Sequence, residues 1–475
     1  MKPVRTRFAP SPTGFLHVGN VRSALFPWLI AKQAGGQFIL RVEDTDQARE
    51  VEGAVQIMHD TLGWLGLTWN EGPDIGGPVG PYTQSERSEI YQKWAQKLIT
   101  SGRAYADIRT PEELTELREQ AKATKKPFLA REFRPQNPPT WEPGMPLRFK
   151  SDPKAYTWHD AVMGDLSTGP EVVDDFIILK SDGLPTYNFA HIVDDAEMGI
   201  THVVRGLEYI ASVPKYLNLY EALDLEVPVL AHVPHIMGED GKRKLSKRDG
   251  AKSILDYRDE GYTPEAMLNF LASMGWNDGT EQEIFSREEL IEKFNLERVQ
   301  RSGARFDEQR LNWMNGAWIR SLDLSDIYTR CQDFWPPEAT GADENYKKQV
   351  LSLVQERLKY FAELPELTTF FFTDLPISPE LITENKQLKK LETTEIKSLL
   401  EQAKATIEQS DFSTEDLTNR LNQLLETTGQ KPGILFSLIR IATTQAPFSP
   451  ALADTLHVLG KNTTLRRLNA QIASL

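Results

Sequence analysis

The chain has 475 residues, of which 40% are hydrophobic and 26% are charged, and its formal net charge at pH 7 is −14. Such a composition is typical of a folded, water-soluble protein, and the length predicts roughly two to four domains. The negative balance excludes a protein that coats nucleic acid indiscriminately, because affinity for phosphate comes from lysine and arginine, but it is compatible with a local basic surface.

Two absences bear on location and cofactors. The chain has neither an apolar amino-terminal signal nor an uninterrupted apolar run of membrane-spanning length, so we expect a cytoplasmic protein that is not in a membrane. Its single cysteine, Cys331, excludes an internal disulfide framework and a cysteine-cluster zinc site. We therefore expect no structural metal.

Strand and helix patterns alternate in the N-terminal part of the chain. VRTRF and QFILRVED predict short strands, and the apolar-periodic residues 18–34 between them predict a helix. Further helices are expected over 50–66 and from the N-cap Ser85 to Gly102, where apolar residues recur at four-residue spacing. This alternation predicts a parallel sheet covered by helices, in a nucleotide-binding α/β domain whose first half spans 1–102.

A proline-rich stretch then interrupts the pattern. The segment KKPFLAREFRPQNPPTWEPGMP contains six prolines, and strand-like pieces such as FIILK follow it. We interpret residues 103–190 as an inserted α/β domain and 191–250 as the second half of the first domain, because the strand pattern VPVLAHVP resumes there. Beyond it, apolar positions three and four apart predict a helical domain over 251–320 and an all-helical region of two subdomains over 321–475.

The segment APSPTGFLHVGN, residues 9–20, follows a predicted strand and opens a predicted helix. Backbone N–H groups and the helix dipole make this position an anion site, for which phosphate is a natural ligand. Gly19 would let a ligand approach the backbone, and His17 could donate a hydrogen bond to a phosphate oxygen. A histidine near a helix start is also commonly structural, so the motif alone leaves both roles open.

A second candidate is the basic loop KRKLSKR, residues 242–248, flanked by Gly241 and Gly250. A pair of its lysines could clamp a triphosphate whose charge is redistributed during a reaction, and the glycines permit the loop to move. A solvated surface loop is the alternative interpretation. The presence of HVGN in the same chain favours the phosphate-binding role.

With these two elements in view, the sequence resembles a known family. HVGN resembles the HIGH signature of class I aminoacyl-tRNA synthetases, and KLSKR resembles their KMSKS signature. RFAPSPTGFLHVGN, FILRVEDTD, GLPTYNFAHIVDD and FDEQRLNWMNG together resemble the bacterial glutamyl-tRNA synthetases, over residues 5–320. A weaker similarity, in LFSLIRIATT and LGKNTTLRRL, extends toward the C-terminus.

The resemblance implies a reaction in two steps. Glutamate attacks the α-phosphate of ATP, which Mg²⁺ accompanies, and glutamyl-adenylate and pyrophosphate form. The glutamyl group is then transferred to the terminal adenosine of tRNA(Glu), and whether tRNA(Gln) is also charged stays open. The resemblance further implies a monomer whose first domain, 1–102 and 191–250, is a Rossmann-type α/β catalytic domain. In this monomer 103–190 binds the acceptor end, 251–320 contacts the tRNA stem and 321–475 binds the anticodon.

The residues to which the resemblance points fall into three groups. The catalytic candidates are His17, Lys244 and Lys247. The candidates for binding ATP are His17, Gly19, Asn20, Glu208 and Lys247. The candidates for binding glutamate are Arg7, Ala9, Ser11, Glu43, Tyr187 and Arg205.

The chemistry of glutamate agrees with the last group. Arg7 and Arg205 suit the side-chain carboxylate, Tyr187 adds a hydroxyl donor, and Glu43 suits the ammonium group. Arg7 also has a structural alternative, an ion pair with Glu43 or Asp44.

Two features depart from the family pattern. The inserted region lacks the cysteines that some members use to bind zinc, which implies that this zinc site is absent. His191 in NFAHIVDD stands where some relatives have an asparagine that contacts the amino-acid backbone. A neutral imidazole at this position could still donate one hydrogen bond.

Four other functions account for parts of the sequence. Glutaminyl-tRNA synthetases share the catalytic motifs, but their anticodon region is a β-barrel, unlike the helical C-terminal third predicted for this chain. A shortened enzyme that glutamylates a modified tRNA base lacks this third, and a small-molecule nucleotidyltransferase leaves it unexplained. A non-catalytic RNA-binding module predicts damage to HVGN or KLSKR, and both are intact. The sequence does not identify the residues that read the anticodon.

Overall fold

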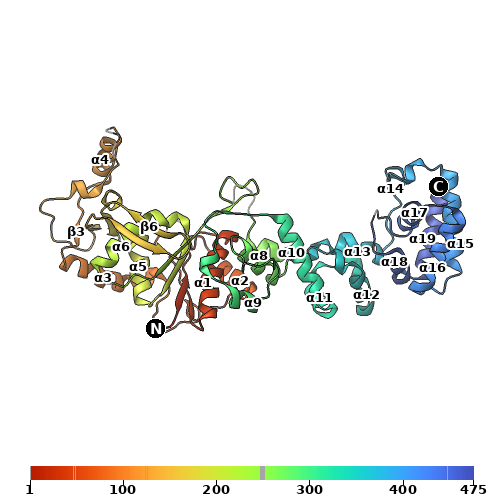
Figure 1. Cartoon of the computed structure of the whole chain (residues 1–475), viewed down its shortest axis with the longest axis horizontal. Coiled ribbons are helices and arrows are strands. Elements are labelled where there is room, and N and C mark those ends of the chain that lie inside the picture. The colour runs from red at the N-terminus through yellow and green to blue at the C-terminus, as the bar shows by residue number, and fades with distance from the viewer. Residues whose placement is uncertain are drawn as a thin grey trace. The chain divides into compact units, whose positions relative to one another are not determined.

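The computed structural model of the chain describes residues 2–46, 48, 50–123, 125, 127–245, 252–446 and 448–475 (Figure 1). The chain forms two compact units. The N-terminal unit comprises Met1–Tyr257 and Pro264–Glu308, and the C-terminal unit comprises Arg258–Thr263 and Gln309–Leu475. The boundaries predicted at 250 and 320 do not coincide with these limits, and the division into five domains stays a prediction.

The N-terminal unit begins with two parallel strands. β1 (Arg5–Phe8) pairs with β2 (Gln37–Leu40), and α1 (Val18–Gln33) connects them. A parallel pair needs such a crossover, because the chain must return to the end of the sheet at which the first strand began. The backbone of Thr201 donates to the carbonyl of Arg5 at 2.9 Å, which brings the segment leading into β8 beside β1. The predicted order of strand, helix and strand is confirmed.

A four-stranded sheet has the order β6-β5-β9-β8. In it β8 (His202–Gly206) and β9 (Val229–Val233) are parallel, and Arg205 is registered with His232. β5 (Tyr156–Asp160) and β6 (Gly164–Thr168) form an antiparallel hairpin that joins β9 through β5. β5 and β6 come from the predicted insertion, and β8 and β9 come from the predicted second half of the first domain. One sheet therefore contains strands from both sides of the boundary predicted at 190.

A three-stranded antiparallel sheet lies within the predicted insertion. It has the order β3-β4-β7. Its hydrophobic side chains pack against helices α3, α5 and α6 in one core that includes Leu98, Phe149, Leu179, Phe189 and Leu219. The bounds of these elements are β3 (Ala104–Ala106), β4 (Leu147–Phe149), β7 (Phe176–Leu179), α3 (Ser88–Thr100), α5 (Tyr187–Glu197) and α6 (Val213–Ala222).

The start of α3 differs from the prediction. Ser85 was expected to cap this helix, but the helix begins at Ser88, after a 3₁₀ turn over Gln84–Arg87. The reason is a competing partner, since the backbone N–H and the hydroxyl of Ser85 both donate to the carboxylate of Asp44, at 2.8 and 2.6 Å. The end near Gly102 agrees with the prediction, because Gly102 adopts a positive φ of 70°.

The remaining elements of this unit are shorter or more peripheral. Figure 1 shows α4 at the tip of a segment that extends away from the sheets. The bounds are α2 (Ala54–Trp64), α4 (Pro111–Ala123), β10 (Ile236–Met237), α8 (Pro264–Ser273), α9 (Arg287–Lys293) and β11 (Ala304–Arg305), with α7 (Ile254–Asp259) at the limit of the unit.

The C-terminal unit contains helices and no strand among the residues that the structure describes, as predicted. α15, α16, α18 and α19 pack beside one another (Figure 1) around buried residues such as Leu400, Leu421 and Leu468. The bounds of the helices from the junction onward are α10 (Glu308–Ser321), α11 (Leu324–Arg330), α12 (Glu344–Val354), α13 (Leu364–Phe372), α14 (Glu380–Thr383), α15 (Thr393–Glu408), α16 (Thr414–Thr428), α17 (Pro432–Thr444), α18 (Leu452–Leu459) and α19 (Lys461–Ser474).

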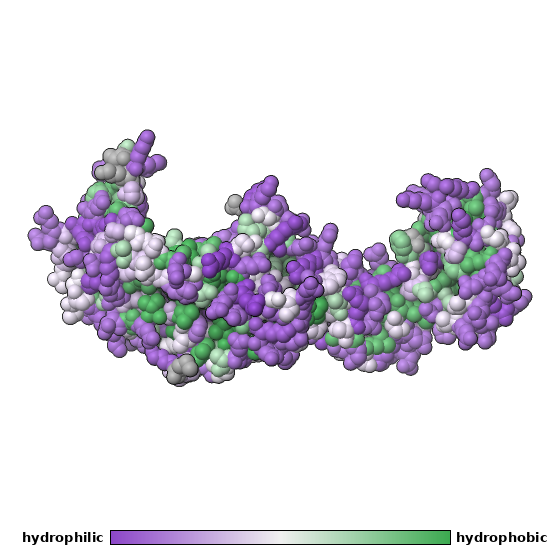
Figure 2. All heavy atoms as spheres, in the orientation of Figure 1, coloured by the Kyte–Doolittle hydropathy of each residue, from purple (hydrophilic) through white to green (hydrophobic). Residues whose placement is uncertain are grey.

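The surface carries mainly polar side chains. In Figure 2 hydrophilic residues cover most of the visible face, and hydrophobic residues appear in smaller patches. None of the helices in the described part of the chain has the length and hydrophobicity needed to cross a membrane.

A buried ion pair between Asp194 and Arg87 tests how strongly the N-terminal unit depends on its buried charges. Asp194 on α5 is fully buried and accepts hydrogen bonds from Arg87, Gln84 and Tyr91 at 2.7, 2.8 and 3.0 Å. Asp194→Asn leaves the buried Arg87 without its carboxylate, which is expected to lower the free energy of unfolding by about 3 kcal/mol or more. Urea unfolding followed by tryptophan fluorescence measures this loss.

The matched control is Glu226→Gln, which removes an ion pair with Lys2 in which both side chains are more than three-quarters exposed, at 76% and 81%. An exposed pair is screened by water, so this variant should unfold like the wild type. Equal stabilities of the two variants would contradict the importance of the buried pair.

Candidate active site

The carboxyl ends of β1 and β8 open onto a cavity of about 530 Å³. In α/β sheets this is the edge at which ligands bind, because loops and helix N-termini converge there. The cavity is lined by β1, the loop that follows it, the segment after β2, the start of α5 and the end of β8. Every residue predicted to bind glutamate lies on its wall: Arg7, Ala9, Ser11, Glu43, Tyr187 and Arg205.

A second cavity, of about 110 Å³, adjoins the first at the N-terminus of α1. Asn20 and Glu208 line both cavities. His17, Gly19 and Lys244 line the second. The structure thus brings together the predicted nucleotide and glutamate residues, except Lys247, which lies outside the described residues.

The N-terminus of α1 is capped by the side chains of His17 and Asn20. The ring Nδ1 of His17 accepts from the backbone N–H of Gly19 at 3.0 Å, and the side chain of Asn20 accepts from the backbone of His17 at 3.3 Å. A nitrogen that accepts carries no proton, so the neutral ring of His17 is protonated on Nε2. A Cβ atom at Gly19 would lie 2.8 Å from Cε1 of His17, so a larger residue there would displace the ring of His17.

Two residues that line the first cavity, Arg7 and Glu43, take part in buried ion pairs. Arg7 donates through Nε and Nη2 to the two carboxylate oxygens of Asp195, at 3.0 and 3.3 Å. Arg41 donates to Asp195 at 2.8 Å and to Glu43 at 2.9 Å. The ion pair considered for Arg7 is therefore formed with a different partner, since Asp195 takes the place of the predicted Glu43 or Asp44.

Burial sets the protonation of these groups. It raises the pKa of the Glu43 carboxyl, although the charges of Arg41 and Arg7 oppose the shift. Burial acts in the same direction on Asp195, but Arg7 and Arg41 outweigh it and hold the pKa of this carboxyl well below its usual range. Burial also raises the pKa of Tyr187, so that its phenol keeps its proton and can donate a hydrogen bond.

Arg205 faces the cavity from β8 and lies among aromatic rings. Its guanidinium carbon lies 5.3 Å from the ring centre of Tyr209 and 4.8 Å from that of Tyr216. His191 donates from Nδ1 to the carbonyl of Tyr187 at 2.7 Å and accepts from Arg205 at Nε2, at 3.3 Å. Because both ring nitrogens have partners, the donation to a substrate that was considered for His191 is not supported.

Glu208 connects the loop after β8 to the segment that leads into KLSKR. Its carboxylate lies 3.6 Å from Nζ of Lys244 and 3.5 Å from Nδ1 of His235. All three side chains line the second cavity. Lys244 therefore has an acidic partner, Glu208, on the wall of this cavity.

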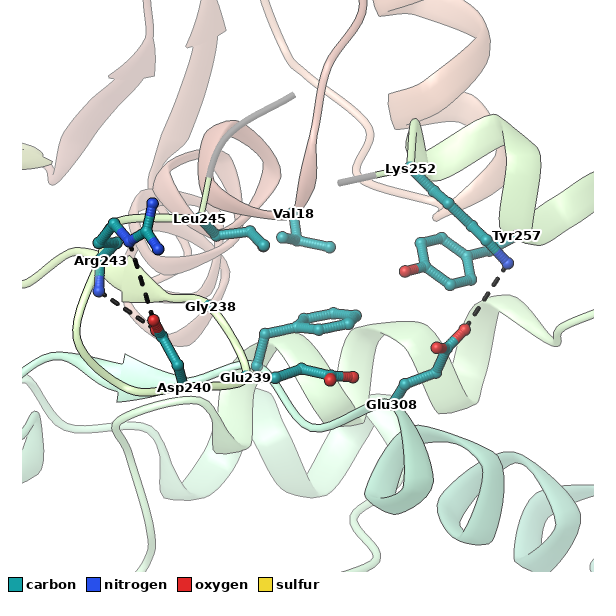
Figure 3. Close-up of a pocket in the computed structure, with 10 residues that line it drawn as sticks. Val18, Gly238, Glu239, Asp240, Arg243, Leu245, Lys252, Tyr257 and Glu308 are labelled. Carbon is teal, nitrogen blue, oxygen red and sulfur yellow. Dashed lines mark hydrogen bonds and ion pairs between the residues drawn. The ribbon is translucent and has the colours of Figure 1, made fainter. Parts of the chain in front are cut away.

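A third cavity, of about 330 Å³, lies between Val18 and the segment 238–245 (Figure 3). Lys252 points toward Glu308, with 3.6 Å between their charged atoms, and Asp240 accepts from the backbone of Arg243. Of the residues that line this cavity, Arg243 and Leu245 belong to the predicted basic loop, and none was named individually as a site residue.

The sequence did not identify four buried residues that hold the side chains lining the cavity, directly or through one another: Arg41, Asp160, Asp195 and His232. A signal existed for one of them, because Asp194 and Asp195 follow the apolar run FAHIV, and adjacent buried carboxylates require cationic partners. His232 in VLAHV has no comparable signal, since its role depends on pairing between strands. Within the described residues no group of three or more His, Cys, Asp or Glu side chains could hold a metal ion.

Comparisons with known proteins agree with this architecture. Residues 3–313 match the model for the catalytic domain of class I tRNA synthetases (E and Q), and residues 326–472 match an anticodon binding domain. A glutamate–tRNA ligase of Clostridium botulinum is 43% identical over 481 residues, covering 99% of this chain and 98% of its own. One of Dehalococcoides mccartyi is 42% identical over 480 residues, with the same coverage.

A solved structure extends the similarity to three dimensions. The crystal structure of a glutamate tRNA ligase from Elizabethkingia meningosepticum, in complex with its amino acid, matches with a TM-score of 0.87 and 31% identity, covering 100% of both chains. The chain therefore belongs to the class I tRNA synthetases of the E and Q type, and among them to the glutamate–tRNA ligase family.

Proposed function

We propose that this chain is a glutamate–tRNA ligase, which activates L-glutamate with ATP and transfers the glutamyl group to the 3′-terminal adenosine of tRNA(Glu). The observation that carries the proposal is the presence of two buried arginines, Arg7 and Arg205, with Glu43 on one cavity wall beside the N-terminus of α1. The names of the Clostridium and Dehalococcoides relatives support the same activity.

The first cavity is assigned to glutamate. A guanidinium has five N–H donors, and within the described part of the chain Arg7 uses three of them, on Asp195 and on the carbonyl of Val204, so two can serve a ligand. Arg7 and Arg205 would bind the γ-carboxylate, and the phenol of Tyr187 would add a third donor. Glutamine would present amide N–H groups to these donors, which disfavours it. Glu43 would pair with the ammonium group, and Ala9 and Ser11 would line the amino-acid backbone.

The second cavity is assigned to the phosphates of ATP. His17, Gly19 and Asn20 stand at a helix N-terminus, where backbone N–H groups and the helix dipole favour an anion. The Nε2–H of His17 and the ammonium groups of Lys244 and Lys247 would stabilise negative charge as pyrophosphate leaves. Glu208 lines both cavities, and we assign it to the nucleotide.

The reaction then follows from these positions. An oxygen of the α-carboxylate attacks the α-phosphorus of ATP, the bond to pyrophosphate breaks, and glutamyl-adenylate forms. A hydroxyl of the terminal adenosine next attacks the activated carbonyl, and AMP leaves. Mg²⁺ accompanies ATP as part of the substrate, and we expect no structural zinc. We expect a cytoplasmic monomer in which residues 103–190 bind the acceptor end and the helical C-terminal unit binds the anticodon.

Exchange of pyrophosphate into ATP tests the proposal, with glutamate or glutamine as the amino acid and with or without bulk tRNA. Exchange that depends on glutamate, and not on glutamine, is the expected result, and the resemblance further predicts dependence on tRNA. No exchange with either amino acid under any of these conditions would contradict the proposed function.

Lys247→Ala tests the transition-state role of the basic loop. Removal of an electrostatic stabiliser of the developing charge is expected to lower the rate of adenylate formation by about 100-fold or more, with little change in the KM for glutamate. Lys242→Ala, an exposed lysine in the same loop, is the control and should behave like the wild type. Equal losses in rate and in glutamate binding by Lys247→Ala would contradict the assignment.

Glu43→Gln tests recognition of the ammonium group. Because burial raises the pKa of Glu43, this carboxyl loses its charge at a higher pH than an ordinary glutamate does. In the wild type, kcat/KM for glutamate is therefore expected to fall as the pH is lowered through this pKa.

Glu43→Gln should lower kcat/KM for glutamate about tenfold or more at neutral pH and should lose this part of the pH dependence. The pH profile of kcat/KM for ATP serves as the internal control. Parallel profiles for glutamate in the variant and the wild type would show that another group is responsible.

A further inference from the structure

The two arginines on the cavity wall are held in different ways. Arg7 pairs with the carboxylate of Asp195. Arg205 forms no ion pair with a carboxylate among the residues that the structure describes, and its guanidinium instead donates to two histidines. Nε donates to Nε2 of His232 at 3.1 Å, and Nη1 donates to Nε2 of His191 at 3.3 Å. Because a guanidinium cannot accept a hydrogen bond, both imidazole nitrogens must be unprotonated acceptors.

The opposite nitrogen of each ring has a partner that fixes the tautomer. His232 Nδ1 lies 2.6 Å from Oδ2 of Asp160, and His191 Nδ1 lies 2.7 Å from the carbonyl of Tyr187. A carboxylate and a carbonyl can only accept, so both rings carry their proton on Nδ1. Asp160 is itself held by the backbone N–H groups of Val162 and Met163, at 3.0 and 2.9 Å.

Both imidazoles are neutral. Burial lowers the pKa of His191 well below its ordinary value, and the charge of Arg205 lowers it further. Burial likewise lowers the pKa of His232, although Asp160 opposes the shift. The side chains of His232 and Asp160 are fully buried. Neutral rings can hold a guanidinium in position without cancelling its charge, whereas a carboxylate in direct contact would pair with it.

We propose that His191 and His232 are positioning residues that determine the preference for a carboxylate over an amide in the side chain of the bound amino acid. They orient Arg205 as neutral acceptors and leave its charge for the ligand. Asp160 maintains this arrangement by holding the proton of His232 on Nδ1. The inference rests on the proposed function, because it identifies the ligand of Arg205 as the γ-carboxylate of glutamate.

Two variants of nearly equal size at position 191 separate charge from shape. His191→Gln retains a neutral acceptor beside Arg205, whereas His191→Glu adds a carboxylate that pairs with the guanidinium. In the full-length enzyme, with tRNA saturating, the KM for glutamate should be higher in His191→Glu than in His191→Gln by about tenfold or more. The ratio of kcat/KM for glutamate to that for glutamine should fall correspondingly, while the KM for ATP is the same in both.

The matched control is the same pair of substitutions at His202, which lies on β8 with Arg205 but does not line the cavity. His202→Gln and His202→Glu should have the same KM for glutamate. A general effect of a new negative charge in this strand would instead raise the KM of His202→Glu as well.

Asp160→Asn supplies an independent test. An amide in place of the carboxylate can donate to Nδ1 of His232, which moves the proton to Nε2 and sets two donors against each other. The KM for glutamate is expected to rise about tenfold. Asp165→Asn, at an exposed position of the same hairpin, is the control.

These measurements separate a failure of the proposed function from a failure of the positioning role of the two histidines. A wild-type enzyme without glutamate-dependent activity contradicts the proposed function itself. An active wild type, together with equal glutamate KM values in His191→Gln and His191→Glu, overturns the role of the histidines and leaves the function standing. If His191→Glu does not fold, Asp160→Asn tests the same role. An unchanged KM for glutamate in Asp160→Asn would then overturn the inference.

Discussion

Two arginines share one buried carboxylate, and the geometry of the candidate site depends on this sharing. Asp195 accepts from Arg7 on β1 and from Arg41 just after β2, and Arg41 also reaches Glu43. Burying these charges is costly unless each has a partner, so loss of any one member would leave another charge buried and unpaired. The geometry of this network determines where Arg7 and Glu43 present their polar atoms to the cavity.

The adjacent Asp194 connects the same helix to another part of the unit. It binds Arg87, and Arg41 lies within 3.7 Å of it. Two consecutive residues of α5 thus hold the first two strands and the turn before α3. A displacement of α5 would separate several of these buried charge pairs at once, which opposes such a displacement. Preorganisation of this kind lets polar groups act on a ligand without rearranging.

The sequence predicted most of the fold because its elements have strong local signals. The apolar periodicity of residues 18–34 corresponds to α1, and the helical C-terminal third is observed. The exceptions have tertiary causes. Ser85 does not cap α3, since Asp44 takes its hydroxyl, and β5 and β6 join a sheet with β8 and β9 that no local pattern indicates. Both outcomes depend on residues far away in the sequence.

The residues of the candidate site also divide into those that the sequence identifies and those that only the tertiary structure identifies. Residues that face the cavity, such as Glu43 and Arg205, could be named from the family resemblance, and the structure gathers them around one cavity. The residues behind them could not be named, because no motif records which strand lies next to which. His232 faces Arg205 only through the register of β8 and β9, and Asp160 reaches His232 only because β5 pairs with β9.

The activity proposed for this chain ends with glutamate attached to the 3′ end of tRNA. The most direct measurement follows labelled glutamate, with ATP and enzyme, onto tRNA(Glu) whose terminal adenosine is intact or has been oxidised with periodate. We expect label on the intact tRNA that mild base removes, as it does from an ester, and no label on the oxidised tRNA. Absence of label on intact tRNA, or equal labelling of both tRNAs, would contradict the proposed activity.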